Sequence, residues 1–217
     1  MQISAPEESD PMKILTNSIL IAFLFQLFGC APQSMTEGDL KKYVLSDKSG
    51  LHQSIEVNHV KMDVIFKPCD LLVIQELRGA SVKNDSTVVV LRKKYKQQYY
   101  FILRTSSNGK EAVSAANLSQ GDFSDVLQNV SFHMGEFVSI TTTKADTILL
   151  TDFVYDRTFG MSSASDILIV FDKRKTEGSD WLQINLRDFG LGTGSQQFRF
   201  RKYDLDYAPK IDFSDTI

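Results

Sequence analysis

Histidine and cysteine are the side chains of this sequence with the widest chemical use, and their spacing matches no catalytic or metal-binding motif. His52, His59 and His133 form no i, i+4 pair of the kind that binds zinc on a helix, and no cysteine lies close to them in sequence. Cys69 has no neighbouring base and is expected to be a small buried hydrophobe. We therefore predict no catalytic residue, no metal site and no cofactor.

A hydrolase or glycan-processing enzyme remains the alternative, because a fold can assemble catalytic groups that are distant in sequence. The serines form no Gly-x-Ser-x-Gly nucleophile elbow, but Ser-His-Asp triads are recognised by geometry rather than by spacing. Such an enzyme would need a pocket in which two of the histidines or aspartates converge with shifted pKa values. The structure can answer that question directly.

Two further segments resemble ligand sites only superficially. The glycine-rich segment Gly190–Gly194 precedes a β-like stretch instead of a helix, so we interpret it as a hairpin loop and not as a phosphate cradle. Asp204 and Asp206 would share one face of a strand, as two Ca²⁺ ligands would. A solvated acidic C-terminal segment is the simpler interpretation.

A basic cluster supplies the candidate surface-binding residues. Arg92, Lys93, Lys94 and Lys96 fall at the end of the predicted strand Thr87–Tyr95. Basic side chains at this density attract anionic lipid headgroups. Lysines also protect an exposed edge strand from pairing with other chains, and this second reading is the one the sequence favours.

The segment Met12–Cys30 has the layout of a secretory signal peptide. Lys13 provides positive charge, and Ile14–Phe28 is a mostly apolar core. This core of about 15 residues is shorter than the roughly 20 apolar residues that a spanning helix needs. The sequence therefore predicts an export signal.

The residues Leu27-Phe28-Gly29-Cys30 resemble the lipobox of bacterial lipoprotein precursors. The resemblance implies that a signal peptidase cuts before Cys30 and that its thiol carries a diacylglycerol. Ala31 is not the aspartate that signals inner-membrane retention in enterobacterial lipoproteins, so the resemblance implies the outer membrane more than the inner membrane. The protein would be anchored to the membrane through the lipid on Cys30.

The chain divides into four segments by these criteria. Residues 1–11 are acidic and precede Met12-Lys13, which indicates an over-extended start. Residues 12–29 form the predicted signal peptide, residues 30–38 a small polar tether and residues 39–217 one domain. A chain of this length can bury a sizeable core.

Composition excludes several classes of protein. Hydrophobic residues make up 42% of the 217 residues and aromatic residues 11%, which excludes disorder over the whole chain. The net charge of -3 argues against a nucleic-acid partner, since such binders carry a basic excess. Two cysteines cannot form a disulfide scaffold.

Hydrophobic periodicity predicts a mainly β (α+β) domain, an antiparallel sheet or sandwich of about nine strands with one or two helices. One helical face stands out, with apolar residues at Phe123, Val126, Leu127, Val130 and Met134 and with Gly135 just beyond its end. A short helical turn is expected over 40–45, and residues 70–77 fit helix and strand equally well. The predicted strands cover 55–57, 60–66, 87–95, 99–105, 137–143, 147–155, 167–171, 182–186 and 197–201.

Leu182, Ile184 and Leu186 alternate with polar residues, which is the clearest period-2 pattern in the chain. We expect these leucine and isoleucine side chains to be buried beside Phe198 and Phe200, across the glycine-rich loop. The function predicted from the sequence is that of a membrane-anchored periplasmic lipoprotein acting as a non-enzymatic binding or assembly module for an unidentified envelope protein. A tethered lipid carrier is a further alternative, and it would require a deep apolar cavity inside the sheet.

Overall fold

The computed structural model describes residues 34–80, 84–115 and 120–214. The predicted start at Met12, the signal segment 12–29 and the lipobox with Cys30 lie outside the described residues. Residues 34–38, which the sequence assigns to the tether, contain strand β1 (Ser34–Met35) and the first residues of helix α2 (Glu37–Val44). Strand β1 pairs in parallel with β12 (Lys210–Ile211), so the beginning and the end of the described chain meet.

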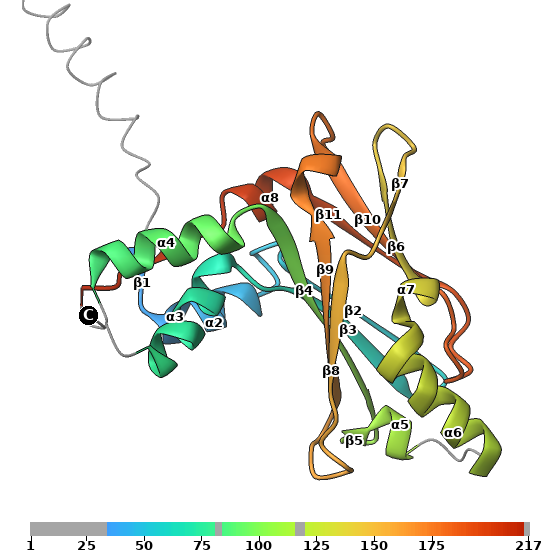
Figure 1. Ribbon diagram of the computed structural model, residues 1–217. Helices are drawn as coiled ribbons and strands as arrows, with labels where there is room; N and C mark the ends of the chain where they lie inside the picture. Colours follow the sequence, from blue (N-terminus) through green and yellow to red (C-terminus); the bar gives the residue numbers. More distant parts are fainter. Residues whose placement is uncertain (1–33, 81–83, 116–119, 215–217) are drawn as a thin grey trace, which may run out of the picture. The chain divides into compact units, whose positions relative to one another are not determined.

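Two antiparallel sheets form the centre of the fold (Figure 1). The larger sheet follows the order β2-β3-β4-β9-β8, with β5 added to β4, and the smaller sheet follows the order β11-β10-β6-β7. The larger sheet contains β2 (His52–Val57), β3 (Val60–Phe66), β4 (Gln98–Ser107), β5 (Lys110–Glu111), β8 (Asp152–Asp156) and β9 (Ser165–Asp172). The smaller sheet contains β6 (Val138–Thr142), β7 (Thr147–Leu149), β10 (Trp181–Leu186) and β11 (Gln196–Arg201).

Helices occur in the connections between these strands. Besides α2 they are α3 (Cys69–Gly79), α4 (Asp85–Tyr95), α5 (Ala112–Ala115), α6 (Gln120–Gln128), the π-helical segment η2 (Asn129–His133), α7 (Met134–Phe137), the 3-10 turn η3 (Lys173–Thr176) and α8 (Lys202–Asp206). The fold is therefore α+β, as the sequence predicts, although it contains more helix than the one or two helices expected.

The larger sheet is covered on both faces, which explains the uninterrupted apolar run in β9. Phe101 on one face contacts Phe200 of the smaller sheet, with ring centroids 5.2 Å apart. Tyr100 and Val170 point to the opposite face because side chains alternate along a strand, and there they pack with Leu72 of α3. Figure 1 shows α2, α3 and α4 gathered on the side of the larger sheet away from β10 and β11.

The expected register of the clearest strands is confirmed. Leu182 faces Phe200 and Ile184 faces Phe198 across the β10–β11 ladder, and all four side chains are buried. Gly190, Gly192 and Gly194 have positive φ in the loop between these strands, as a hairpin loop requires. The predicted strands 55–57 and 60–66 are present in β2 and β3, which form a hairpin that turns at Asn58 and His59 with positive φ at both residues.

The prediction of a strand over Thr87–Tyr95 is wrong, because this segment is helix α4. The side chain of Asn84 accepts hydrogen bonds from the backbone N–H and the hydroxyl of Thr87, which caps the helix N-terminus. Val88 and Leu91 are buried on one side of the helix. The valines of this segment favour a strand only weakly, and capping and packing against α3 decide the outcome.

Three other expectations also change. Residues 70–77, which the sequence leaves open, lie within helix α3. The helix that begins with α6 continues past Gly135 to Phe137, through η2 and α7. Residues 147–155 are not one strand, because β7 and β8 belong to different sheets. Among the described helices, none is both long enough and apolar enough to cross a bilayer.

Candidate functional site: a basic pocket beside helix α4

A cavity of about 300 Å³ lies where β3 ends, β4 begins and α8 leads into β12. Its volume is at the lower end of the range for small-molecule sites. Apolar groups of Phe66, Tyr99, Leu205 and Pro209 contribute to its walls. The remaining wall is strongly charged, with five basic side chains against two carboxylates. The charged lining residues are Lys67, Arg92, Lys96, Lys173, Lys210, Asp70 and Asp206.

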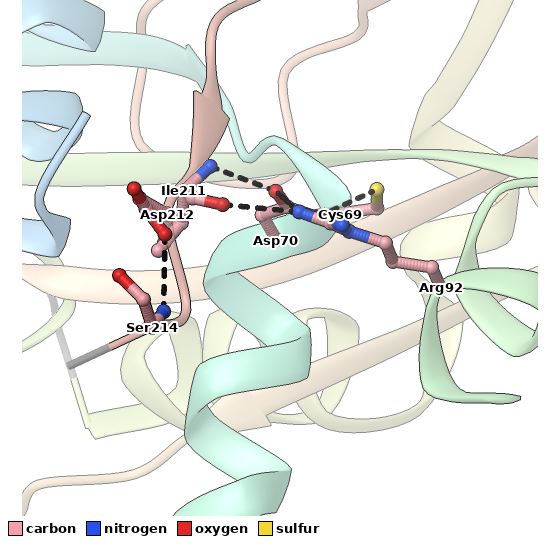
Figure 2. Close-up of polar contacts among 6 residues, drawn as sticks. All are labelled: Cys69, Asp70, Arg92, Ile211, Asp212 and Ser214. Atoms are coloured by element: carbon pink, nitrogen blue, oxygen red, sulfur yellow. Dashed lines mark hydrogen bonds and ion pairs between the residues drawn. The ribbon is translucent and has the colours of Figure 1, made fainter. Parts of the chain in front are cut away.

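Both carboxylate oxygens of Asp70 accept hydrogen bonds from other groups of the protein (Figure 2). Arg92 donates two hydrogen bonds to its carboxylate, from Nε to Oδ1 at 2.8 Å and from Nη2 to Oδ2 at 2.6 Å. The backbone N–H of Ile211 donates to the same carboxylate at 2.8 Å, and the Ile211 carbonyl accepts from Arg92 at 3.1 Å. This network joins α3, α4 and β12, and it raises the pKa of Arg92 through the hydrogen bonds to Asp70.

Asp206 is the second carboxylate of the pocket whose charge is paired within the protein. Lys173 and Lys202 each form an ion pair with it at 2.6 Å, and the Tyr99 hydroxyl donates to it at 2.6 Å. Burial would raise the pKa of Asp206, but these hydrogen bonds together lower it. Burial and the bond to Asp206 raise the pKa of Tyr99 well above its ordinary value.

Three lysines of the pocket form no ion pair with any residue that the structure describes. The Lys67 ammonium donates to the neutral side chain of Gln75, at 3.2 Å, and burial lowers the pKa of Lys67, aided by the nearby positive charge of Lys41. Lys96 and Lys210 are exposed at the rim. Because both carboxylates are already satisfied, the pocket has a surplus of three positive charges and attracts anions.

Cys69 also lines the pocket but is poorly suited to be a nucleophile. Burial raises the pKa of its thiol to about 11, and the negative charge of Asp70 adds to the effect. Reactive cysteines have lowered pKa values, because the thiolate is the attacking species. The raised pKa agrees with the expected unreactive thiol. The side chain is half-buried, however, and not fully buried as expected.

The structure divides the basic cluster that the sequence singles out. Arg92 and Lys96 line the pocket, whereas Lys93 and Lys94 lie outside it, and Lys94 pairs with Glu76 at 2.8 Å. The cluster is in the last turn of α4, where positive charge also stabilises the helix dipole. It does not guard an edge strand, because the segment is not a strand. Lys173 and Lys210 were missed, since only the fold brings them beside Arg92.

An enzyme would need two of the histidines or aspartates to lie close together. One such pair, His52 and Asp63, occurs on the β2–β3 hairpin. His52 Nε2 lies 2.8 Å from Asp63 Oδ1, and Lys61 lies 3.3 Å from the same oxygen. Burial would raise the pKa of Asp63, but hydrogen bonds from His52 and Ser54 lower it. The order is wrong for a triad, because the carboxylate and not the imidazole contacts the serine. Neither His52 nor Asp63 lines the basic pocket. His59 is exposed in the β2–β3 turn, and His133 Nδ1 lies 3.3 Å from Glu136 Oε1.

The other sequence candidates have structural roles in the described part of the chain. Asp204 and Asp206 are in helix α8 instead of on a strand face, and Asp204 pairs with Arg201. The Gly190–Gly194 loop donates backbone N–H groups to the carboxylate of Asp188, which lowers the pKa of Asp188 despite burial. Residues 34–80, 84–115 and 120–214 contain no group of three or more acidic, histidine or cysteine side chains placed to hold a metal ion.

Comparison with protein-family models, with curated proteins and with solved structures found no match to this chain. The class of protein is therefore described by its fold and its site: an α+β sandwich with a basic, partly apolar pocket at the ends of the strands of its larger sheet.

Proposed function

We propose that this chain is a lipid-anchored envelope protein that binds a small anion with an apolar body in the basic pocket. The observation that carries the proposal is the surplus of three positive charges above a partly apolar wall. A carboxylate or phosphate group would pair with the uncommitted lysines, and an attached hydrocarbon would lie against Phe66 and Leu205. Such ligands include fatty acids and alkyl phosphates.

Binding is favoured over catalysis by the protonation states of the pocket groups. General acid–base catalysis works best when a group titrates near the operating pH. Here the pKa of Cys69 is raised to about 11 and that of Asp206 is lowered. Histidine is absent from the residues that line the cavity. A lipid carrier would need a deep apolar cavity inside the sheet. The described cavity instead lies at the strand ends, while Phe101 and Phe200 fill the space between the sheets, so the geometry disfavours this alternative.

The test compares three probes with equal hydrocarbon chains: octanoate, octyl phosphate and octanol, measured by titration calorimetry on the full chain. We expect the two anions to bind and octanol to bind at least tenfold more weakly, a difference of about 1.4 kcal/mol. Lys96→Ala and Lys210→Ala should each weaken anion binding about tenfold. Lys93→Ala is the matched control, because Lys93 is also exposed and is on α4 but lies outside the pocket. Equal affinity for octanol, or an equal loss with Lys93→Ala, would contradict the proposal.

The anchor is proposed on separate grounds, from the lipobox residues Leu27-Phe28-Gly29-Cys30. Metabolic labelling with a fatty acid should label the wild type and not Cys30→Ser, while Cys69→Ser keeps the label. The intact mass should show a mature chain that begins at Cys30 and carries acyl groups, since two or more chains are needed for stable anchoring. The outer membrane is the proposed destination, because Ala31 follows the cysteine. A mature chain that starts elsewhere would leave a plain secreted protein.

A further inference from the structure

The outward face of α4 combines exposed aliphatic and basic side chains. Val89 and Val90 are 65% and 64% exposed, which is unusual for valine in a folded domain. Lys93 follows them at i+4 and i+3, so the three side chains share one helical face. We define this outer α4 face as Ser86, Val89, Val90 and Lys93; Lys96 follows in the same direction and is shared with the pocket rim.

We propose that the outer α4 face rests on the surface of an anionic lipid bilayer. Interfacial helices place apolar side chains at the headgroup boundary and lysines beside the phosphates. Protein interfaces differ in composition, because their cores are enriched in tryptophan, tyrosine and arginine and depleted in lysine. Valine next to lysine therefore matches a membrane better than a protein partner. On the neighbouring helix α3, the carboxylate of Glu76 is already paired with Lys94 and bonded to Tyr95.

The proposed anchor is close in sequence to the first described strand. Strand β1 begins at Ser34, only four residues after Cys30, and four extended residues span at most about 14 Å. Strand β1 pairs with β12, and Ile211 of β12 bonds to Arg92 of α4. A lipid on Cys30 would therefore limit the distance between Ser34 and the bilayer surface to that reach. This step rests on the proposed anchor, whereas the composition of the face does not.

The opposite end of the larger sheet offers a control with different chemistry. The β8–β9 connection carries Phe159 and Met161, which are 70% and 84% exposed. The connection leads into Ser165 of β9, which pairs with Thr105 near the end of β4. Helix α4 leads into Gln98 at the beginning of β4, so the two features lie at opposite ends of this strand. Figure 1 shows this connection at the far end of β8 and β9 from α4. If general hydrophobicity determined membrane contact, this loop would dock instead.

The test uses the full chain, purified in detergent and reconstituted with vesicles of phosphatidylcholine alone or mixed with phosphatidylglycerol. An environment-sensitive fluorophore is attached at Ser86→Cys or at Ser163→Cys, two exposed serines at the two ends, and the labelled site is verified by peptide mapping. We expect a blue shift of the emission at position 86 in anionic vesicles. The shift should be absent at position 163, should be smaller in phosphatidylcholine alone and should decrease with added salt.

Lys93→Glu should abolish the shift at position 86, and Val89→Ser with Val90→Ser should reduce it. None of these residues lines the pocket, so octanoate affinity should stay unchanged. If the wild type shows the shift at position 86 but does not bind octanoate, the pocket proposal alone is contradicted. No shift at position 86 in anionic vesicles, a shift that Lys93→Glu leaves intact, or an equal or larger shift at position 163 would overturn the membrane proposal.

Discussion

Two of the bidentate arginine–aspartate pairs in the described part of the chain, Arg92–Asp70 and Arg104–Asp166, have nearly the same geometry and very different surroundings. Arg92 holds Asp70 at 2.8 and 2.6 Å, and Arg104 holds Asp166 at 2.7 Å through both contacts. The Asp70 side chain is only 3% exposed, whereas that of Asp166 is 36% exposed. The first pair joins three separate elements, while the second joins β4 and β9, which backbone hydrogen bonds already connect.

From this difference we expect burial and connectivity, more than contact geometry, to determine what each ion pair contributes to stability. A pair exposed to water gains little, because solvent screens the charges. A buried pair that loses one partner leaves the other charge poorly solvated. Asp70 also satisfies the backbone N–H of Ile211, so its loss would leave a buried donor without a partner. The four predictions that follow test this contrast and the chemistry around each pair.

The largest effect is expected from Asp70→Asn, which keeps the side-chain volume and removes the charge. The free energy of unfolding should fall by about 3–5 kcal/mol, nearer the lower value because Arg92 retains some access to water. Asp166→Asn is the matched control and should cost at most about 1 kcal/mol. Urea unfolding of both variants measures the difference. Equal losses would show that burial does not distinguish the pairs.

The next effect concerns Cys69, which lies beside Asp70 and has no counterpart near Asp166. Because burial and Asp70 raise its pKa from 9.0 to about 11, the thiolate population at neutral pH should be about 100-fold lower than for an ordinary thiol. Alkylation by iodoacetamide, followed by the mass of the peptide that contains Cys69, should accelerate with pH up to about 11. A plateau close to the ordinary thiol pKa of 9.0 would contradict this environment.

A smaller effect is expected at Asp63, on the β2–β3 hairpin. Asp63→Asn should lower the free energy of unfolding by about 1–2 kcal/mol at neutral pH, since the carboxylate accepts from His52 and Ser54. The pKa of Asp63 is lowered in the folded protein, so its contribution is complete above the unfolded value of about 3.9 and is lost as the pH falls through the folded value. Urea midpoints of wild type and variant should therefore converge in acid. A gap that widens below about pH 4 would reverse this sign.

The smallest effects are expected from the histidines. His59→Ala and His133→Ala should change the free energy of unfolding by no more than about 0.5 kcal/mol, because both side chains are on the surface. These variants and His52→Ala should bind octanoate as the wild type does and should retain function in the native cell. Loss of function with unchanged abundance in any one of them would favour the enzyme alternative, with His52 and Asp63 as its centre.

Local pattern was sufficient for the elements whose periodicity has a single interpretation. The alternation of Leu182, Ile184 and Leu186 predicted both the strand and its buried face, because a strand has a strict period of two. The strands on either side of Asn58-His59 were recognisable for a similar reason, since apolar and polar residues alternate along both of them. The helical face from Phe123 to Met134 was found through its 3.6-residue period.

The sequence by itself thus determined the α+β class, the register of its clearest strands and the basic character of residues 92–96. Only the tertiary structure decided that α4 is a helix, because the β-branched run of Val88, Val89 and Val90 is overridden by the Asn84 cap and by burial against the neighbouring helix α3. The pocket was equally invisible, since its walls come from residues as distant as Phe66 and Lys210. Charge and burial are properties of neighbours in space, and a linear pattern shows only neighbours along the chain.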